Sequence, residues 1–483
     1  MAESRPDEPV LPPRWTQSDR FVPQRFVQPV LSFMRYEAAG GIIMLVAAVV
    51  AVVWANSPVG DSYFDIFGTK IEIAFGDFHF HHLSELTVQE WINDAAMVIF
   101  FFVVGLEIKR ELVVGELREP KAAALPAVAA LGGMVVPALI YVFFNAGTEA
   151  SGGWGIPMAT DIAFAVGVVS LVGQRVPIGA KLFLLALAIV DDLGAILVIA
   201  IFYTDELAFA WLVAAGIGLL GAYAMQRAGI RSMLAYVAVG TFVWLAVLES
   251  GVHATIAGVV LALLTPVKAY FDPRRFANRA EGLVERIDEY LPEEDPSTAD
   301  HHTLERVGVL LNDLSHLSRE TLSPLDRLEQ TLAPWSAYVV VPLFALANAG
   351  VVIEFSRLGE LLTENVTLGV ALGLLVGKTL GVTAFAWLAI RLGIGKMPPR
   401  TSWRDMIGMA MLSAIGFTVA LFVSALSFDE GSAAADEAKI GIFAASLVAG
   451  IAGYVWLKMF GGAADGGDED PEVQTDVPVV VTH

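Results

Sequence analysis

The sequence predicts an all-α membrane protein that crosses the bilayer about twelve times. Of its 483 residues, 56% are hydrophobic and only 17% are charged, whereas soluble domains average about 25% charged residues. Apolar stretches of about 20 residues, the length that spans a bilayer as a helix, recur along most of the chain. Together with the placement of the basic residues, these observations outweigh the several soluble domains that length alone would allow.

The expected spans are apolar segments separated by polar connections. Each segment is predicted to form one membrane helix, because it is long enough and carries few charges. The predicted helix cores are Ala39–Ser57, Ile92–Leu106, Ala122–Phe144, Ile156–Val172, Leu182–Phe202, Ala208–Met225, Met233–Leu248, Val252–Val267, Pro334–Val352, Leu368–Leu392, Met406–Leu426 and Ile440–Met459.

Basic residues follow a pattern that supports this count. When the N-terminus is placed in the cytoplasm and the sides alternate, the inside segments hold all but four of the 30 Lys and Arg residues. The exceptions are Lys70, Arg357 and Lys439 in outside loops and Lys378 within a helix. Such a bias is the positive-inside rule. Both termini are therefore expected in the cytoplasm.

The connections divide the chain into a membrane domain and polar extensions. Residues 1–36 are predicted to form a cytoplasmic tail, residues 37–459 the membrane domain, and residues 460–483 a disordered acidic tail. Residues 268–330 form a polar insertion on the cytoplasmic side. The insertion is expected to hold one or two amphipathic helices, because Leu304, Val307, Leu311 and Leu314 share one helical face.

One outside loop, Gly60–Glu85, has a different pattern. It alternates apolar and polar residues on either side of Gly76-Asp77. Alternation around a glycine-containing turn is typical of a β-hairpin, so a small external hairpin is expected here.

Composition excludes several classes of partner. The chain has no cysteine, so disulfides and thiolate metal sites are excluded. The net charge of −21 argues against nucleic acid. The polar N-terminus is not a signal peptide, and the first span is expected to direct insertion. Membrane lipid is the expected environment, and no cofactor is expected.

Four ionisable residues lie within predicted apolar helices: Asp161, Asp191, Asp192 and Lys378. Each costs about 2.5–3.5 kcal/mol at the centre of a membrane helix on insertion scales. An ion pair that only fastens helices together is the simplest alternative explanation. Three acids against one base leave an excess of negative charge, which favours a functional site.

The adjacent pair Asp191 and Asp192 is suited to exchange protons for a cation. Neighbours on a helix point about 100° apart, so both carboxylates can border one cavity. Two close carboxylates resist simultaneous ionisation and titrate as a unit. When ionised, their oxygens suit a hard cation such as sodium. The pair would therefore hold either protons or a cation, and Lys378 is the expected counter-ion.

Glycine and proline interrupt two of the predicted spans. Gly152, Gly153, Gly155 and Pro157 precede Thr160-Asp161, and Gly416 interrupts the eleventh span. Interrupted segments in the two halves of a transporter indicate discontinuous helices at a midplane site. Asp161 would balance positive helix N-termini and Lys378 negative C-termini. For Gly416 alone, tight helix packing explains the residue equally well.

Several long motifs resemble the NhaA family of bacterial sodium/proton antiporters. The likeness extends from about Tyr36 to Met459 and is interrupted by the insertion. The motifs are Trp91-Ile-Asn-Asp, Val104-Gly-Leu-Glu-Ile-Lys-Arg-Glu, Ala159-Thr-Asp-Ile-Ala-Phe-Ala, Ala186-Leu-Ala-Ile-Val-Asp-Asp-Leu-Gly-Ala, Ser250-Gly-Val-His-Ala-Thr, Pro342-Leu-Phe-Ala-Leu-Ala-Asn-Ala-Gly and Gly377-Lys-Thr-Leu-Gly.

The resemblance implies a fold and an activity. The fold would be an inverted repeat in which discontinuous helices 4 and 11 cross. The activity would be electrogenic export of sodium or lithium, driven by proton entry, in a bacterial inner membrane. Asp191 and Asp192 would carry the ions, Lys378 would pair with Asp191, and Thr160 and Asp161 would lie beside the cation. The family is commonly a dimer that meets at the external β-hairpin.

The resemblance also points to residues linked to pH regulation. These are Glu107, Arg110, Glu111, Glu329 and His253. Glu107 and Glu111 are one helical turn apart, and a solvated helix end is an equally good explanation for them. His253 is more simply a packed, hydrogen-bonded histidine. Next to Glu329 the family often has histidines, where this chain has Gln330 and Ala333.

Three rival functions remain to be separated by experiment. An intramembrane aspartic protease would place its two aspartates on different helices. A passive cation channel needs no buried carriers that are neutralised in each cycle. An antiporter for another monovalent ion, such as potassium, shares the same residues, because cavity size decides the selectivity.

Overall fold

The computed structural model describes most of the predicted membrane domain. The described residues are 39–71, 86–204, 207–230, 232–269, 271–291, 300–352 and 358–462. The predicted N-terminal tail, most of the predicted external hairpin and all but the first residues of the acidic C-terminal tail lie outside these ranges.

Within the described residues, seven helices are long and apolar enough to cross a membrane, and the number rises to nine if each of two bent pairs counts as one span. The seven helices are Val88–Val113, Pro120–Asn145, Ile178–Phe202, Phe209–Arg227, Pro324–Asn348, Asn365–Arg391 and Ala433–Phe460. The bent pairs are Glu149–Met158 with Ile162–Arg175, and Trp403–Ser413 with Phe417–Ser427. The chain is therefore a helical, multi-pass membrane protein.

Three shorter apolar helices fall on the other predicted spans: α2 (Ala39–Ala55), α10 (Met233–Leu248) and α11 (Thr255–Leu264). Their length and composition do not by themselves identify them as spans, so the count of twelve stays a prediction. The remaining helices that form the bundle are α4 (Val88–Trp91), η3 (Ile92–Ala96), α5 (Met97–Val113), α6 (Pro120–Asn145), η5 (Glu149–Met158), α7 (Ile162–Val172), α8 (Ile178–Phe202), α9 (Phe209–Arg227), α14 (Pro324–Trp335), η8 (Ser336–Val340), α15 (Val341–Asn348), α17 (Asn365–Leu372), η9 (Gly373–Lys378), α18 (Thr379–Arg391), α19 (Trp403–Ser413), α20 (Phe417–Ser427) and α21 (Ala433–Phe460).

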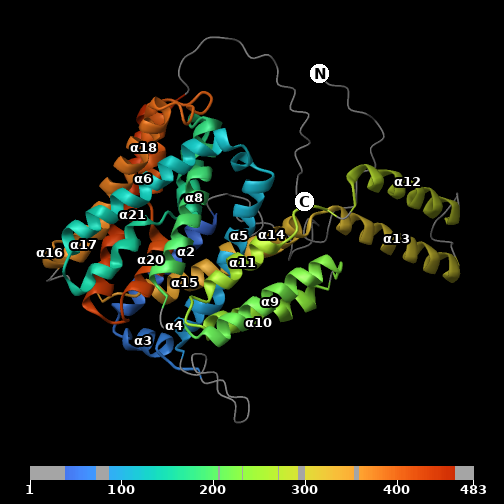
Figure 1. The fold of residues 1–483 in the computed structure, drawn as a ribbon, viewed down its shortest axis with the longest axis horizontal. Helices are drawn as coiled ribbons and strands as arrows, with labels where there is room; N and C mark the ends of the chain where they lie inside the picture. The colour runs from blue at the N-terminus through green and yellow to red at the C-terminus, as the bar shows by residue number, and fades with distance from the viewer. Residues whose placement is uncertain are drawn as a thin grey trace.

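The helices pack into one bundle with a separate pair on its flank (Figure 1). α6 contacts η5, α8, α17 and α18, and α8 contacts α19 and α5, so α8 lies inside the bundle. α9 and α10 pack against each other and join the rest mainly through α11, which packs along α5. The core that positions the buried charges is therefore built from α6, α8, α18 and the two bent pairs.

A close backbone approach fixes α6 against α18. A Cβ atom on Gly381 would lie 2.2 Å from the carbonyl oxygen of Gly132, and one on Gly132 would lie 2.3 Å from that of Gly381. Only glycine at both positions allows the two helices to touch through their backbones. Gly381 follows Lys378 by less than one turn, so this contact helps to position the lysine side chain.

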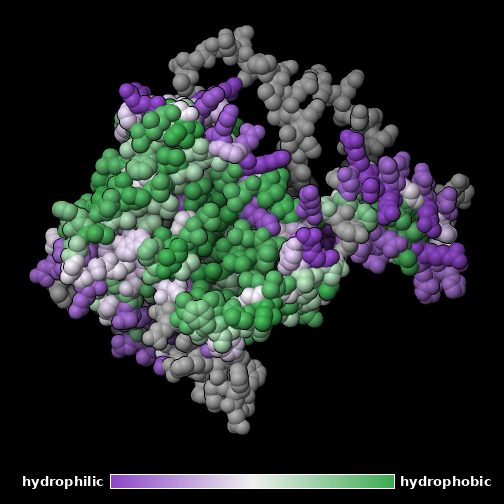
Figure 2. Space-filling model, viewed as in Figure 1, coloured by the Kyte–Doolittle hydropathy of each residue, from purple (hydrophilic) through white to green (hydrophobic). Residues whose placement is uncertain are grey.

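Apolar side chains cover the flank of the bundle. Phe143 on α6, Leu220 on α9 and Leu234 on α10 are largely exposed. Figure 2 shows a continuous hydrophobic surface over the flank, with hydrophilic residues at the ends of the bundle and on the projecting helices. Soluble monomers do not expose apolar surface on this scale, so the flank is the part that lipid covers.

The predicted insertion forms two helices, α12 (Pro273–Tyr290) and α13 (His301–Thr321), that project away from the bundle (Figure 1). α12 packs along α13. The buried face of α13 carries Val307, Leu310 and Leu317, whereas Leu304 and Leu311 are about half exposed. The buried face of α13 is therefore rotated from its predicted centre, toward the side that packs along α12.

The ninth predicted span begins earlier than expected. The sequence predicts a helix from Pro334, but α14 begins at Pro324 and continues through Pro334 into η8 and α15. Pro334 removes one backbone donor inside the helix. The wider π-helical turn of η8 comes directly after it and accommodates the irregularity.

The described part of the outside loop is helical and irregular. Helix α3 (Asp61–Phe67) follows α2, and no strand is found among the described residues, which include only the first part of this loop, 60–71. Lys70 and Thr87 form an isolated antiparallel bridge, and the Ile71 N–H donates to the Leu86 carbonyl at 3.0 Å. The strands of the predicted hairpin fall between these residues and lie outside the described ranges.

Candidate functional site

The two bent helix pairs break at the residues that the sequence indicated. η5 and α7 meet at 41° across Ala159–Asp161, and α19 and α20 meet at 42° across Ala414–Gly416. Pro157 at the end of η5 has no N–H group to continue a helix. Asp161 then begins α7 as its N-cap, accepting the N–H of Phe164 at 3.0 Å.

The two breaks are hydrogen-bonded to each other. The Asp161 N–H donates to the Ile415 carbonyl at 2.7 Å, and the Thr160 hydroxyl donates to the Ser413 carbonyl at 2.9 Å. Thr160, Asp161 and Ser413 are buried. Backbone groups that lose their helical partners at one break therefore find new partners at the other, as a low-dielectric interior requires.

Asp161 lies between two helix N-termini. Its Oδ1 accepts the Phe164 N–H at the start of α7, and its Oδ2 accepts the Thr418 N–H at 3.1 Å and hydroxyl at 2.7 Å at the start of α20. A negative charge is favourable at the positive end of a helix dipole. The location of Asp161 at the N-termini is the one expected from the sequence.

Lys378 lies at a helix C-terminus and on a carboxylate. Its Nζ is 2.6 Å from Oδ2 of Asp191 and also donates to the carbonyl of Met158, the last residue of η5. Both charged side chains are only 1% exposed. The ammonium therefore neutralises one aspartate and faces the negative end of the η5 dipole. The expected pairing of Lys378 with Asp191 and its expected position at a C-terminus are both present.

Asp191 and Asp192 occupy the middle of α8 and are buried. Oδ1 of Asp191 and Oδ1 of Asp192 have no hydrogen-bond partner among the described residues. Thr160 lies beside Asp191. A buried carboxylate oxygen without a partner is costly, so both oxygens are suited to bind a proton or a hard cation.

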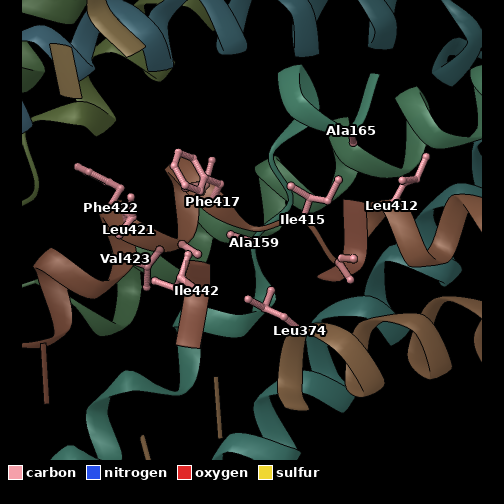
Figure 3. Close-up of a cluster of buried hydrophobic side chains, with 14 of the residues drawn as sticks. Ala159, Ala165, Leu374, Leu412, Ile415, Phe417, Leu421, Phe422, Val423 and Ile442 are labelled. Carbon is pink, nitrogen blue, oxygen red and sulfur yellow. The ribbon is translucent and has the colours of Figure 1, made fainter. Parts of the chain in front are cut away.

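Apolar side chains surround the breaks. Figure 3 shows Ala159, the first residue of the η5–α7 break, with Ile415 and Phe417 on one side and Leu374 on the other. All four are buried. Each charge in this buried site therefore interacts more strongly than it would in solvent.

A cavity of about 510 Å³ opens beside α8 at the end of the bundle where α5 ends. Its lining includes Glu111 on α5 and Leu182, Leu185 and Ala186 on α8. Asp192 follows Leu185 by two helical turns and therefore lies on the same face of α8. The cavity thus lies on the face of α8 that carries Asp192, two turns away along the helix.

A second cluster of charges lies at this end of α5. Arg110 on α5 forms an ion pair with Glu329 on α14, and its Nε is 4.0 Å from Glu111. Glu107, one helical turn before Glu111, interacts electrostatically with Glu329 and with Asp192. The structure thus brings together four of the five residues that the sequence linked to pH regulation: Glu107, Arg110, Glu111 and Glu329.

His253 lies apart from this cluster. It precedes Ala254, which packs with Trp91 and Val98 near the start of the α4–α5 span. Lys109 lies near the other end of that span. Its ammonium group donates hydrogen bonds to the carbonyls of Leu263 and Thr265, at the end of α11. α11 therefore runs alongside α5, with His253 at the end opposite to Glu111.

Sequence reasoning missed three groups that complete the site. Thr418 donates both its N–H and its hydroxyl to Asp161, and the carbonyls of Met158 and Ser413 accept from Lys378 and Thr160. Thr418 follows Gly416 by two residues, the position in which an N-terminal hydroxyl and N–H face an anion. The two carbonyls carry no signal in the sequence.

Among the described residues, no three His, Asp or Glu side chains are arranged as a compact metal-binding cluster.

Comparison with known proteins identifies the family. The profile of the family described as "Na+/H+ antiporter 1" matches residues 31–457. The chain belongs to this family. The family consists of membrane transporters and not of enzymes.

Relatives of similar length confirm the membership. The chain is 45% identical to the Na(+)/H(+) antiporter NhaA of Rhodopirellula baltica over 429 residues, 89% of this chain and 93% of the relative. It is 41% identical to NhaA 1 of Saccharophagus degradans over 95% of this chain and 96% of the relative. For NhaA of Sulfurimonas denitrificans the identity is 43%, over 92% and 98%. The resemblance predicted from the motifs is confirmed.

Proposed function

We propose that the chain exchanges sodium for protons across a bacterial inner membrane, with Asp191 and Asp192 as the shared carriers. Membership in the antiporter family supports the sodium/proton exchange. The observation that supports the carriers is the pair of buried, unpartnered oxygens on adjacent aspartates, beside the buried ammonium group of Lys378. Each oxygen can accept a proton or coordinate a cation, and occupancy by one excludes the other.

The proposed cycle uses Lys378 as a removable counter-ion. When the site holds no cation, the ammonium group neutralises Asp191, and a proton neutralises Asp192. A sodium or lithium ion enters through the cavity at the end of α5. It displaces the proton from Asp192 and competes with the Lys378 ammonium group for Asp191. Thr160 and Asp161 contribute oxygen atoms beside the cation. Lys378 releases its proton when the cation takes its place on Asp191, and Asp192 releases a second proton, so two protons leave for each cation that binds and transport is electrogenic.

Alternating access is proposed to involve the two bent helix pairs. Their breaks are hydrogen-bonded to each other, and Met158 before the first break accepts a hydrogen bond from Lys378 on η9, which pairs with Asp191 on α8. Discontinuous helices of this kind move against the rest of a transporter about a fixed midplane site. The bent pairs would be the crossed helices 4 and 11 of an inverted repeat.

Regulation and assembly complete the proposal. The cluster of Glu107, Arg110, Glu111 and Glu329 lies beside the cavity that approaches Asp192 and would set the active pH range, with His253 as a separate contributor. The cavity would open to the cytoplasm, with both termini on that side. We also propose that two copies of the chain dimerise through the external hairpin. The strands of this hairpin lie outside the described residues.

The experiment uses everted membrane vesicles whose interior is acidified by respiration, with a dye that reports the pH difference. Sodium, lithium, potassium and choline chlorides are added in turn to vesicles with the full chain, Asp191→Asn or Asp192→Asn. Asp65→Asn, an exposed aspartate on α3, is the matched control. Sodium-driven proton release in the full chain and in Asp65→Asn, absent in the other two variants, is expected.

Other outcomes contradict distinct parts of the proposal. A response to potassium and not to sodium or lithium would keep the carriers and replace the ion. Full activity in either Asp191→Asn or Asp192→Asn would remove that residue as a carrier. A non-saturable sodium flux without proton movement would indicate a channel.

A further inference from the structure

A strongly basic surface lies at the end of the bundle where α7 ends and α8 begins. Three segments form it: 173–182, 393–405 and 454–462. Figure 2 shows hydrophilic residues gathered at this end, at the top of the view. Six basic residues of these segments make up the basic patch: Arg175, Lys181, Lys396, Arg400, Arg404 and Lys458.

Contacts between the segments show that they form one surface. Arg175 donates to the Lys458 carbonyl at 2.6 Å, and Trp456 donates its indole N–H to the Arg404 carbonyl at 2.9 Å. A Cβ atom on Gly179 would lie only 2.5 Å from the carbonyl oxygen of Pro399. The three segments are therefore packed against one another.

The patch has almost no acidic residues of its own. Its three segments contain one acid, Asp405, whose exposed surface is 0%. The Asp405 carboxylate accepts the N–H and hydroxyl of Ser402 and, at 3.3 Å, the N–H of Gly462. The Asp405 carboxylate is thus buried and hydrogen-bonded within the fold, whereas most of the basic side chains of the patch are exposed. The surface carries a large positive charge at neutral pH.

An acidic segment of the same chain begins at this surface. The Gly462 N–H donates a hydrogen bond to Asp405, the neighbour of Arg404, so the acidic segment leaves the bundle beside the basic patch. Residues 463–476 contain six acids and no Lys or Arg: Asp465, Asp468, Glu469, Asp470, Glu472 and Asp476. The first acid is three residues beyond Gly462, within about 10 Å even for an extended chain.

We propose that the acidic segment 465–476 binds the basic patch of its own chain. Opposite charges attract over about 10 Å at ordinary ionic strength, and the tether keeps the acids at a high effective concentration beside the patch. Anionic lipid headgroups are the competing occupant of a basic surface at a membrane. The tether and the matched number of opposite charges favour the acidic segment.

The consequence for transport rests on the proposed function. Lys181 precedes Leu182, which lines the cavity that approaches Asp192. A free positive patch beside this cavity would lower the local sodium concentration, and a bound acidic segment would cancel that effect. The acidic segment would therefore raise the apparent affinity for sodium without touching the site.

Binding is tested with spin labels, which the absence of native cysteine permits. Gln174→Cys, an exposed uncharged position beside Arg175, and Gly467→Cys are labelled in the full chain, which is placed in nanodiscs of zwitterionic lipid. One tail variant replaces the six acids by Asn or Gln. A second keeps the six acids in scrambled order. Neither changes a residue of the bundle, so folding is preserved.

A short, narrow distance distribution is expected for the native and scrambled tails. The amide tail, or high choline chloride, should give a long, broad distribution. A broad distribution for the native tail at low salt would overturn the proposal. So would a short distance that persists in the amide tail, because charge would then not be its cause. Loss of the short distance when half the lipid is phosphatidylglycerol would assign the patch to lipid.

Transport supplies a separate readout. The amide tail should raise the apparent KM for sodium about two- to fivefold at low ionic strength, with no difference at high ionic strength. An unchanged KM together with a short label distance would overturn the effect on transport and leave the binding intact. If the full chain moves no sodium, the proposed function fails, while the label distances still decide the binding.

Discussion

Lys378 joins two parts of the site through one ammonium group. Its Nζ contacts Asp191 on α8 and the Met158 carbonyl at the end of η5. Removing one member of a buried ion pair leaves the other charge unpaired, at a cost of about 3–5 kcal/mol. Removing both can be nearly neutral, because no unpaired charge remains.

Lys378→Met is therefore expected to lower the melting temperature, and Asp191→Asn in the same chain should restore most of the loss. Transport by Lys378→Met should fall but not vanish, because Asp192 remains. Thermal unfolding of the two single variants and the double variant in detergent gives the coupling directly. A double variant that is less stable than Lys378→Met would show that the ion pair does not set the stability of the site.

The aspartates and Lys378 could be predicted from the sequence, because ionisable residues in apolar helices stand out. Their partners could not. Thr418 binds Asp161 across 257 positions of the chain, and Met158 contributes a backbone carbonyl that no residue type indicates. Pairing at such separation depends on how helices pack, and periodicity contains no information about it.

At the scale of elements, irregular helical turns determine where side chains point. Lys378 is the last residue of η9, a π-helical segment between α17 and α18. A π-helical turn holds an extra residue and rotates the helix after it. A regular helix from Leu368 to Leu392, as the sequence predicted, would aim Lys378 differently. The breaks at Ala159–Asp161 and Ala414–Gly416 were predictable, because Pro157 precedes the first and Gly416 lies in the second, whereas the π-helical turns have no such marker.

The glycine contact between α6 and α18 is expected to tolerate no side chain. Gly381→Ala would place a methyl group 2.2 Å from the Gly132 carbonyl oxygen, so the helices must separate, at about 1–3 kcal/mol. Gly216→Ala on α9 is the matched control, because nothing lies within 4 Å of its added Cβ atom. There alanine should be neutral or slightly stabilising, by up to about 1 kcal/mol.

Thermal unfolding of both variants, with sodium-driven proton release measured alongside, distinguishes the two positions. Gly381→Ala should lose stability and transport together, because Lys378 moves with α18. Equal melting temperatures for the two variants would mean that the helices separate without cost and that the contact does not position Lys378.

At the scale of the whole molecule, the bundle and the projecting helices are separate bodies of different character. The bundle presents an apolar flank, whereas α12 and α13 are mostly hydrophilic and extend away from it (Figure 2). Composition predicted a polar insertion between apolar spans but placed its end at residue 330, whereas the span that contains α14 already begins at Pro324. It did not predict that the helices would project, because an amphipathic helix can lie on a membrane or pack against a partner helix equally well.

The projecting helices are expected to be dispensable for transport. Their two ends lie together, since the Phe271 N–H donates to the Glu320 carbonyl at 3.2 Å, so a short linker can replace residues 272–321. The excision must stop before Ser323, whose side chain accepts the Asp326 N–H and caps α14, the helix that carries Glu329.

Sodium-driven proton release in vesicles should keep its maximal rate, while its pH dependence is free to shift through Glu329. Ser323→Ala in the full chain shows how much of any shift comes from the cap alone. Complete loss of transport in a deletion variant that elutes as a folded protein would show that α12 and α13 take part in the transport cycle.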